Sequence, residues 1–413
     1  MSSTRISTVP PPGRAARCRL GALAALLLIA GGTAAGAGSG HGGGLPEGAV
    51  GLDVSARGDI VDALIAYHHH GVYRLEHRRS ADGGRSWGEG VEIPTTDRAP
   101  AAPHRGMDAQ IAAHGDRVVA LWTIPGSSAW GSGPLTTALS SDGGRTWSAG
   151  PNPADDGSDD GHGFSDLAFD AAGRLHAVWL DGRDGSQGLR WARSDDAGRS
   201  WTANVTIDSP ICECCWNKVV PREGGTAYVL YRDVEPRDMA LAATPDAGAT
   251  WSRLGPTEAF DWRIDGCPHV GGGLAVTASE RGEELHVLSW TGKSEVAGLY
   301  LETSGDGGRS WREPYPLAGA GAQHGDLAAR GEILAVAWDE IVSGSRVVFA
   351  ATSADAGASW TPRLRFSADG AKASHPLVVA VGDDFVVLWT ESTEGSPAVW
   401  RAVRLREAVA AGR

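Results

Sequence analysis

Cysteine, phenylalanine, tyrosine and methionine are all scarce in this sequence. The 413 residues include 5 cysteines, 6 phenylalanines, 6 tyrosines and 3 methionines. Long apolar runs are also missing: beyond the first 37 residues, no segment approaches the roughly 20 apolar residues that a membrane-spanning helix needs. Basic residues are too few to balance the acids, with 37 lysines and arginines against 50 aspartates and glutamates. This negative charge repels nucleic acid and anionic lipid, so neither is expected as a partner.

The first 37 residues have the composition of an export signal. A basic stretch around Arg14 precedes the apolar run 20–30, and small residues follow it. Because this run is short for a membrane span, we favour a cleaved signal peptide at 1–37 over an uncleaved anchor. A glycine-rich linker at 38–45 follows. We therefore expect an exported protein, periplasmic or extracellular, without membrane contact after cleavage. The signal holds four arginines and no acid, so cleavage would change the formal net charge from −13 to −17 and also remove Cys18.

Glycine and tryptophan, by contrast, are abundant, with 58 and 16 residues. Both recur in six segments that fit the pattern S/T-x-D-x-G-x-S/T-W, which indicates an internal repeat. The aspartates of these segments are Asp82, Asp142, Asp196, Asp246, Asp306 and Asp355. Aspartate can accept hydrogen bonds from turn amides and glycine supplies backbone freedom, while the tryptophan can pack between neighbouring repeats. We therefore expect these segments to be structural turns that take no part in chemistry.

Short segments with alternating apolar residues lie between these turns. The second strand of each repeat ends near a tryptophan or tyrosine, as in RVVALWT (117–123), TAYVLYRD (226–233) and FVVLWTE (385–391). A period of two marks half-buried strands, so we expect an all-β fold: a β-propeller of four-stranded blades at 46–406, with a C-terminal tail at 407–413. Seven strand copies favour seven blades, the six turns favour six, and we expect seven. The segment after the linker would close the ring as an outer strand.

The six turns resemble Asp boxes, the hairpin turns of sialidase-type β-propellers, and this resemblance extends over about residues 46–405. The middle third of the chain further resembles a group of exported bacterial sialidase-like proteins. The shared motifs are HGF (His162–Phe164), VWLDGR (Val178–Arg183), CxCC (Cys212–Cys215), YRD (Tyr231–Asp233) and W-x-I-x-G-C-P (Trp262–Pro268). The sialidase resemblance implies an exo-glycosidase or a glycan-binding propeller, whose small-molecule or glycan ligand binds at the axis.

Two of these motifs supply candidate catalytic residues at the ends of second strands, where a propeller places its ligand funnel. They are Asp181, Arg183, Tyr231, Arg232 and Asp233. A sialidase needs three arginines for the substrate carboxylate, a tyrosine nucleophile with a glutamate partner, and an aspartate acid/base. This sequence departs from that pattern, because the first blade has no RIP-type arginine motif and no glutamate is fixed beside Tyr231. The two arginines could instead clamp a carboxylate or sulfate, or the acids could orient metal-bound histidines; ordinary ion pairing is the alternative.

Histidine and cysteine concentrate in the loops that precede the innermost strands, which converge on one mouth of the propeller axis. These residues are His104, His162, Cys212, Cys214, Cys215, Cys267, His269, His324 and His375. Imidazole and thiolate together suit a transition metal, copper first and zinc second, so we expect a metal site with a redox or metal-handling role. A histidine-lined funnel for an anionic ligand and a purely structural role are the alternatives. No nucleotide cofactor is expected, and the protein should be a monomer.

The cysteines allow other roles. In an exported protein, Cys212 or Cys214 could form a disulfide with Cys267 in the next blade. A bond between the neighbours Cys214 and Cys215 would be strained, so at least one thiol should have another function. A cysteine nucleophile would need a paired base, which the spacing does not supply. Whether Cys212 is a metal ligand or a disulfide partner is therefore left to the tertiary structure.

Overall fold

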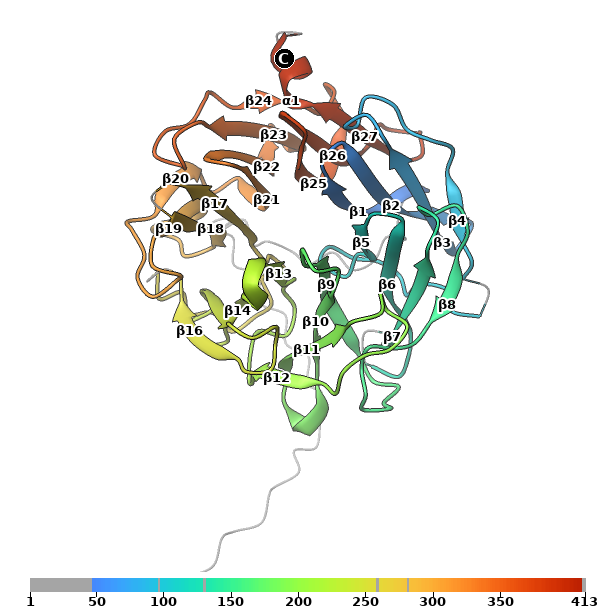
Figure 1. Ribbon diagram of the computed structural model, residues 1–413. Helices are drawn as coiled ribbons and strands as arrows, with labels where there is room; N and C mark the ends of the chain where they lie inside the picture. The colour runs from blue at the N-terminus through green and yellow to red at the C-terminus, as the bar shows by residue number, and fades with distance from the viewer. Residues whose placement is uncertain (1–46, 96, 129–130, 258–259, 281, 411–413) are drawn as a thin grey trace, which may run out of the picture. The chain divides into compact units, whose positions relative to one another are not determined.

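The computed structural model describes residues 47–410 apart from 96, 129–130, 258–259 and 281, so the expected signal peptide and linker lie outside the described residues. Its strands form seven sheets that follow one another around a central axis (Figure 1). Six sheets have four strands and the seventh has three. The fold is therefore an all-β propeller, and the prediction of seven blades is confirmed. No helix in the described part of the chain is long and apolar enough to cross a membrane.

Each blade is a meander in which the chain runs away from the axis strand by strand. The innermost strands of blades 1 to 7 are β1 (Gly48–Arg57), β5 (Gln110–His114), β9 (His162–Phe169), β13 (Lys218–Pro221), β17 (Gly273–Ser279), β21 (Ala322–Arg330) and β25 (Lys372–Val381). The second strands are β2 (Ile60–His69), β6 (Arg117–Pro125), β10 (Leu175–Asp181), β14 (Ala227–Arg232), β18 (Gly282–Thr291), β22 (Ile333–Val342) and β26 (Asp384–Ser392).

The outer half of each blade is shorter. The third strands are β3 (Val72–Ser80), β7 (Ser132–Ser140), β11 (Gly188–Ser194), β15 (Met239–Thr244), β19 (Gly298–Ser304), β23 (Ser345–Ser353) and β27 (Val399–Arg404). The fourth strands of blades 1 to 6 are β4 (Val91–Ile93), β8 (Ser148–Gly150), β12 (Val205–Asp208), β16 (Ser252–Pro256), β20 (Tyr315–Ala318) and β24 (Leu364–Arg365). Within the described residues, the helical elements are two short 3-10 turns, η1 (Arg183–Gly185) and η2 (Glu223–Gly225), and the helix α1 (Leu405–Ala410) after blade 7.

The ring closes between blade 7 and blade 1 without an exchanged strand. β1 is the innermost strand of its own blade, so the prediction that this segment would be an outer closing strand is wrong. Gly48 forms an isolated parallel bridge with Ala398, and the amide of Ala49 donates a 2.8 Å hydrogen bond to the Ala398 carbonyl. Side chains of β1 and β2 then pack against those of β25 and β26 in one apolar cluster. Leu405 and Ala408 of α1 are buried in the apolar cluster between blades 6 and 7.

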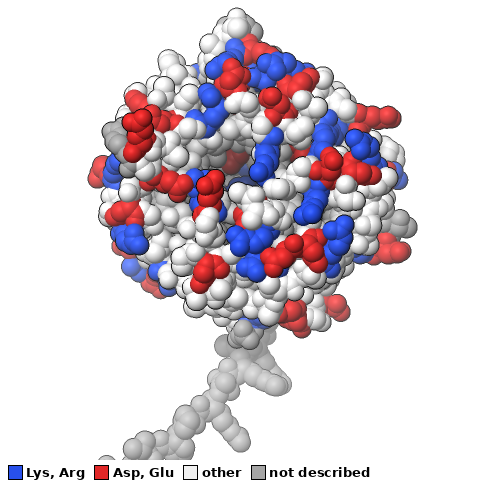
Figure 2. Space-filling model, in the orientation of Figure 1, with Lys and Arg blue, Asp and Glu red and all other residues white. Residues whose placement is uncertain are grey.

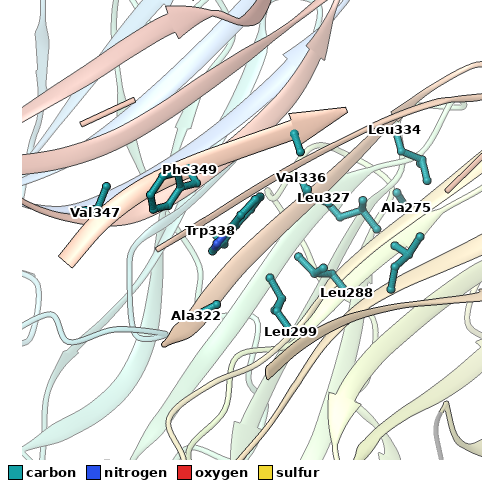
Figure 3. Close-up of a cluster of buried hydrophobic side chains, with 12 residues drawn as sticks. Ala275, Leu288, Leu299, Ala322, Leu327, Leu334, Val336, Trp338, Val347 and Phe349 are labelled. Carbon is teal, nitrogen blue, oxygen red and sulfur yellow. The ribbon is translucent and has the colours of Figure 1, made fainter. Parts of the chain in front are cut away.

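An apolar cluster lies between each pair of neighbouring blades, and the alternating second strands contribute to all of them. In β22, Leu334, Val336 and Trp338 pack toward blade 5, while Ala335 and Ala337 pack toward blade 7. Figure 3 shows the interface between blades 5 and 6, in which leucines of blade 5 lie near Trp338. Both faces of these strands are buried, because each blade is covered by a neighbour on two sides. The alternation in the sequence predicted burial of one face only. Close packing of this kind determines where the loops at the strand ends lie.

The Asp boxes close the turns between third and fourth strands. In the first box, the amide and hydroxyl of Ser86 donate to Asp82 at 2.9 and 2.6 Å, and Ser80 donates a third hydrogen bond at 2.8 Å. These bonds hold the pKa of the carboxyl well below its usual value. The same arrangement recurs at the other five aspartates. The Gly83 amide donates to the carbonyl of Asp59 in the turn between β1 and β2, so the boxes lie at the propeller end opposite to the loops that precede the inner strands.

The two small residues that follow the aspartate of each box differ in whether they can carry a side chain. Three boxes have alanine at the first position, where Ala197, Ala247 and Ala356 adopt left-handed φ values of 58, 57 and 53°. At the second position the turn passes close to the preceding blade: a Cβ on Gly144 would lie 2.0 Å from the His77 ring. Only glycine fits so close an approach, which explains why this position is glycine in all six segments.

Candidate functional site

The three clustered cysteines lie in the loop that leads into β13, at the mouth of the axis. Their sulfur atoms form a triangle: Cys212 Sγ lies 3.5 Å from Cys215 Sγ and 3.8 Å from Cys214 Sγ, and the third side is 3.9 Å. All three side chains are buried, with exposed fractions of 4% or less, and none is in a disulfide. The amide of Cys212 donates a 3.1 Å hydrogen bond to the Arg232 carbonyl, which ties the loop to the end of β14.

Positive charge faces this sulfur triangle. Arg237 donates a 3.1 Å hydrogen bond from Nη1 to Cys212 Sγ, and the buried Arg232 acts on the same thiol through its charge. Hydrogen bonds from Cys214 and Cys215, together with Arg232, hold the pKa of Cys212 far below its usual value. The pKa of Cys214 is raised by its hydrogen bonds to the other two thiols, and that of Cys215 by burial. A cation that displaced the thiol protons would be held by three sulfurs.

A second group of potential ligands overlaps the first at Cys214. The sulfur atoms of Cys214 and Cys267 and one ring nitrogen of His269 all lie within 4.8 Å of one another. Cys267 is exposed and is not in a disulfide, so the cross-link to Cys212 or Cys214 considered above is not formed. The ring of His104 lies 6.2 Å from that of His269, centroid to centroid, at an interplanar angle of 89°. The loops that lead into blades 2, 4 and 5 thus converge at one place.

His324 and His375, from blades 6 and 7, are held by acidic partners instead. His324 Nδ1 lies 2.8 Å from a carboxylate oxygen of Asp339, and His375 Nε2 lies 3.3 Å from one of Asp108. The other ring nitrogen of His375 bonds to the Thr390 hydroxyl at 2.9 Å. Burial lowers the pKa of both imidazoles, that of His375 to about 4, so both are neutral at pH 7. Neither belongs to the ligand groups around Cys214. The structure therefore brings together fewer potential ligands than the sequence predicts.

His162 is also separate from the cysteines. It is 1% exposed, one ring nitrogen donates to a backbone carbonyl at 2.8 Å, and Nε2 lies 3.1 Å from Asp156 Oδ1. Asp181 completes a third group of potential ligands, but Arg183 and Arg190 each donate to its carboxylate at 2.9 Å. Two guanidinium groups beside one acid disfavour a further cation. This group is therefore an ion-paired network at the end of β10, and the prediction that His162 joins the cysteines as an axial ligand is corrected.

The remaining candidate catalytic residues are buried between blades. Tyr231 is 0% exposed, donates from its hydroxyl to Asp208 at 2.6 Å, and has its pKa raised by burial. Arg232 donates to three backbone carbonyls, and Asp233 pairs with Arg253. The Tyr231 hydroxyl and the Arg232 guanidinium are therefore both engaged within the protein, an arrangement that favours structural roles. The candidate catalytic roles of both residues stay predictions.

A charged cluster on the axis is not apparent from the motifs. Lys218 Nζ lies 3.7 Å from Asp166 Oδ1, and Asp53 and Asp326 also act on its charge. Each of the three aspartates accepts a hydrogen bond from an amide of the next blade's inner strand, at 2.6, 2.7 and 2.9 Å. Burial raises the pKa of Asp53 to about 7 and also raises that of Asp166. Figure 2 shows acidic and basic side chains interspersed around a hollow at the centre of the viewed face. The sequence contains a pattern that could have identified this cluster. The inner-strand segments LDV, SDL and GDL each place an aspartate beside an apolar residue.

Comparison with known proteins relates these features to a family. The BNR repeat-like domain family matches residues 74–318, more than half of the chain. An ulvan lyase, described as a new family of polysaccharide lyase, PL25, has a similar structure with a TM-score of 0.59 and 11% identity, over 89% of this chain and 98% of the lyase. Trypanosoma rangeli sialidase in complex with the inhibitor DANA has a TM-score of 0.50 and 12% identity, over 74% of this chain. No curated protein matches the chain.

These matches differ in what they establish. The chain spans only 55% of the Trypanosoma rangeli sialidase, and identities of 11 and 12% show a shared fold without a shared chemistry. The family match, in contrast, covers five of the six Asp boxes. With its Asp boxes, its seven-bladed ring and the match over residues 74–318, the chain belongs to the BNR repeat-like domain family.

Proposed function

We propose that this protein binds a thiophilic metal ion at the axial mouth of its propeller, with Cys212, Cys214 and Cys215 as ligands. Cuprous copper is the preferred ion and zinc the second choice. The observation that carries the proposal is the sulfur triangle, with sides of 3.5, 3.8 and 3.9 Å.

The triangle has the size that metal coordination requires. With a metal–sulfur bond of about 2.3 Å, two sulfurs of a tetrahedral site lie about 3.8 Å apart, and two sulfurs of a trigonal planar site about 4.0 Å apart. A disulfide would bring two of them to about 2.0 Å. The observed sides of 3.5 to 3.9 Å fit a common metal ion and do not fit a disulfide.

The surroundings favour cuprous copper over zinc. Thiolates are soft ligands, which suit cuprous copper, and this ion accepts three-coordinate sites. Three thiolates around one monovalent cation leave two negative charges, which Arg237, at 3.1 Å from Cys212 Sγ, and the buried Arg232 help to neutralise. Zinc would need a fourth ligand to complete its tetrahedron. Burial of all three sulfurs keeps water away from the ion.

A role in metal handling is the form of the proposal that the position of the site supports. Cys267 is exposed and shares a ligand group with the buried Cys214, so an ion could pass from solvent to the triangle through successive thiolates. We further propose that the chain is exported, on the strength of the signal-like residues 1–37, which would place this activity outside the cytoplasm.

Metal analysis of the purified protein tests the proposal. Protein loaded under anaerobic, reducing conditions with either cuprous copper or zinc should retain copper after competition with a chelator. The Cys212→Ser/Cys215→Ser variant should lose it, whereas His69→Ala, which removes a histidine that is 72% exposed and pairs with Glu47, should not. Circular dichroism of each variant confirms folding. Equal copper content in wild type and folded double variant would refute the site, as would absence of copper from the wild type.

A glycan ligand is the second candidate function, favoured by a cavity near the axis. This cavity of about 410 Å³ lies between blades 6, 7 and 1 and has Arg346, Lys372, His375 and Glu391 in its lining. Its size suits a monosaccharide unit, and its cationic side chains suit a carboxylate or sulfate. The family match and the fold shared with a sialidase and a polysaccharide lyase agree with such a ligand.

Calorimetric titration with sialic acid and with glucuronic acid tests this second candidate. Binding should weaken about tenfold in Lys372→Ala, the loss expected for one charged hydrogen bond, and remain unchanged in the cysteine variants. Hydrolysis of a fluorogenic sialoside would assign an exo-glycosidase, and binding without hydrolysis a lectin-like role. Absence of binding at millimolar sugar would rule the candidate out.

A further inference from the structure

We propose that the axial site holds two metal ions, with the thiolate of Cys214 as the bridge between them. This inference rests on the proposed metal-binding function and extends it from one ion to a pair. The inner ion would be bound by the sulfur triangle of Cys212, Cys214 and Cys215. The outer ion would be bound by Cys214, Cys267 and His269. Cuprous copper is the ion that suits both donor sets.

The geometry shows two groups that share one atom. Cys214 Sγ lies 3.8 Å from Cys212 Sγ and 3.9 Å from Cys215 Sγ in the inner group. The same sulfur lies within 4.8 Å of both Cys267 Sγ and a ring nitrogen of His269 in the outer group. Cys267 and His269 come from the loop that leads into blade 5, and Cys214 comes from the loop that leads into the preceding blade. A thiolate has several lone pairs and can bridge two ions without loss of either bond.

A single tetrahedral site fits the arrangement of these ligands less well than two sites. Such an ion would need its fourth ligand about 3.8 Å or less from all three sulfurs of the triangle. Neither Cys267 nor His269 is within 4.8 Å of all three sulfurs, since each groups only with Cys214. The outer residues are therefore displaced to the solvent side of Cys214, where they can complete a second site but not the first.

Charge and donor type agree with two monovalent ions. Four thiolates and two cuprous ions carry two negative charges in total. Arg237 donates to Cys212 at 3.1 Å, and its charge also acts on Cys214 and Cys267, so one guanidinium faces both sites. The buried Arg232 supplies the second positive charge. Three sulfurs for the inner ion and two sulfurs with one imidazole for the outer ion are both three-coordinate sets, which suit cuprous copper.

Burial gives the two sites different exchange properties. The sulfurs of the inner triangle are at most 4% exposed, whereas Cys267 is exposed and His269 is partly exposed. A chelator can therefore reach the outer ion first. We expect copper removal in two phases, in which the outer ion leaves rapidly and the inner ion slowly.

Stoichiometry decides between one ion and two. Anaerobic titration with cuprous copper against a chromophoric chelator should give two ions per wild-type chain. Cys267→Ser should reduce the count to one, and because Cys267 is exposed this change opens no cavity. The matched control is Asp265→Ser, an exposed residue of the same loop, which should keep both ions. X-ray absorption at the copper edge should show metal–metal scattering in the wild type and none in Cys267→Ser.

The outcomes separate this inference from the proposed function. One ion per wild-type chain that Cys267→Ser leaves in place would overturn the pair and keep the mononuclear site. No bound copper at all would overturn both. Two ions that both persist in Cys267→Ser, or two ions without metal–metal scattering, would overturn the bridge through Cys214.

Discussion

Replacement of Lys218 by methionine tests whether the axial charge cluster ties the blades together. At a separation of 3.7 Å and an effective dielectric constant of about 20, the pair with Asp166 is worth about 4 kcal/mol. Methionine has a similar volume and no charge, so it would leave Asp53 and Asp166 buried without their counter-ion. Removal of one partner from a buried ion pair typically costs about 3–5 kcal/mol. We therefore expect a loss of about 3–4 kcal/mol in the free energy of unfolding at pH 8.

The loss of stability in Lys218→Met should be larger at high pH than at low pH. Burial raises the pKa of Asp53 to about 7 although Lys218 lowers it, and without the lysine this pKa should rise further. A carboxyl with a raised pKa in the folded state binds protons that the unfolded chain does not bind. Its contribution to stability is therefore present at low pH and is lost as the pH rises through the folded-state value. The variant should be much closer to wild type at pH 5 than at pH 8.

Unfolding measurements at both pH values give the answer. Calorimetry and tryptophan fluorescence can follow unfolding of wild type and of Lys218→Met. Lys372→Met is the matched control, because Lys372 is exposed and its replacement should change stability by less than about 0.5 kcal/mol. A loss below about 1 kcal/mol at pH 8, or an equal loss at pH 5 and pH 8, would refute the electrostatic reasoning.

Three further predictions concern the frame of the propeller. Burial lowers the pKa of His176 and His286 to about 4. The free energy of unfolding should therefore fall as the pH falls from 6.5 toward 4, by about 2 kcal/mol per histidine at pH 5. A melting temperature that rises on acidification would contradict this. Asp196→Ala should cost about 1–2 kcal/mol through lost turn hydrogen bonds, while the exposed neighbour Asp195→Ala should cost less than about 0.5 kcal/mol; equal losses in urea unfolding would contradict this. Trp338→Ala should cost about 3–5 kcal/mol, because Trp338 is 1% exposed in the cluster between blades 5 and 6, and a loss below 1 kcal/mol would show that the cavity collapses.

Much of the fold could be predicted because its determinants are local. The Asp boxes depend on hydrogen bonds within a few residues, as at Asp82 and Ser86, so the pattern alone identifies them. The blade number followed from seven copies of an alternating strand. The role of the first strand could not be predicted from the boxes, because the Asp box of blade 1 follows the third strand and does not mark the first. Its position as an innermost strand depends on pairing with β2 and on packing against β25.

The candidate site was predictable only in part. The repeat places Cys212 and Cys267 in loops at the same mouth of the axis, which the structure agrees with. The repeat cannot say which way a side chain points once the loop is folded. His162 begins an innermost strand as expected, yet its ring turns to Asp156 because that carboxylate satisfies it in a buried position. Tyr231 ends a second strand as expected, yet it faces the preceding blade.

The sequence by itself determined the class of fold, the number of blades and the face on which histidine and cysteine gather, because spacing along the chain controls hydrogen-bonded turns and strand alternation. Only the tertiary structure decided that Cys212, Cys214 and Cys215 form a triangle and that Lys218 meets three aspartates from different blades. These contacts join residues that lie tens to hundreds of positions apart or depend on a single side-chain direction. Their geometry follows from the angle between blades and from burial, which repeat patterns do not encode.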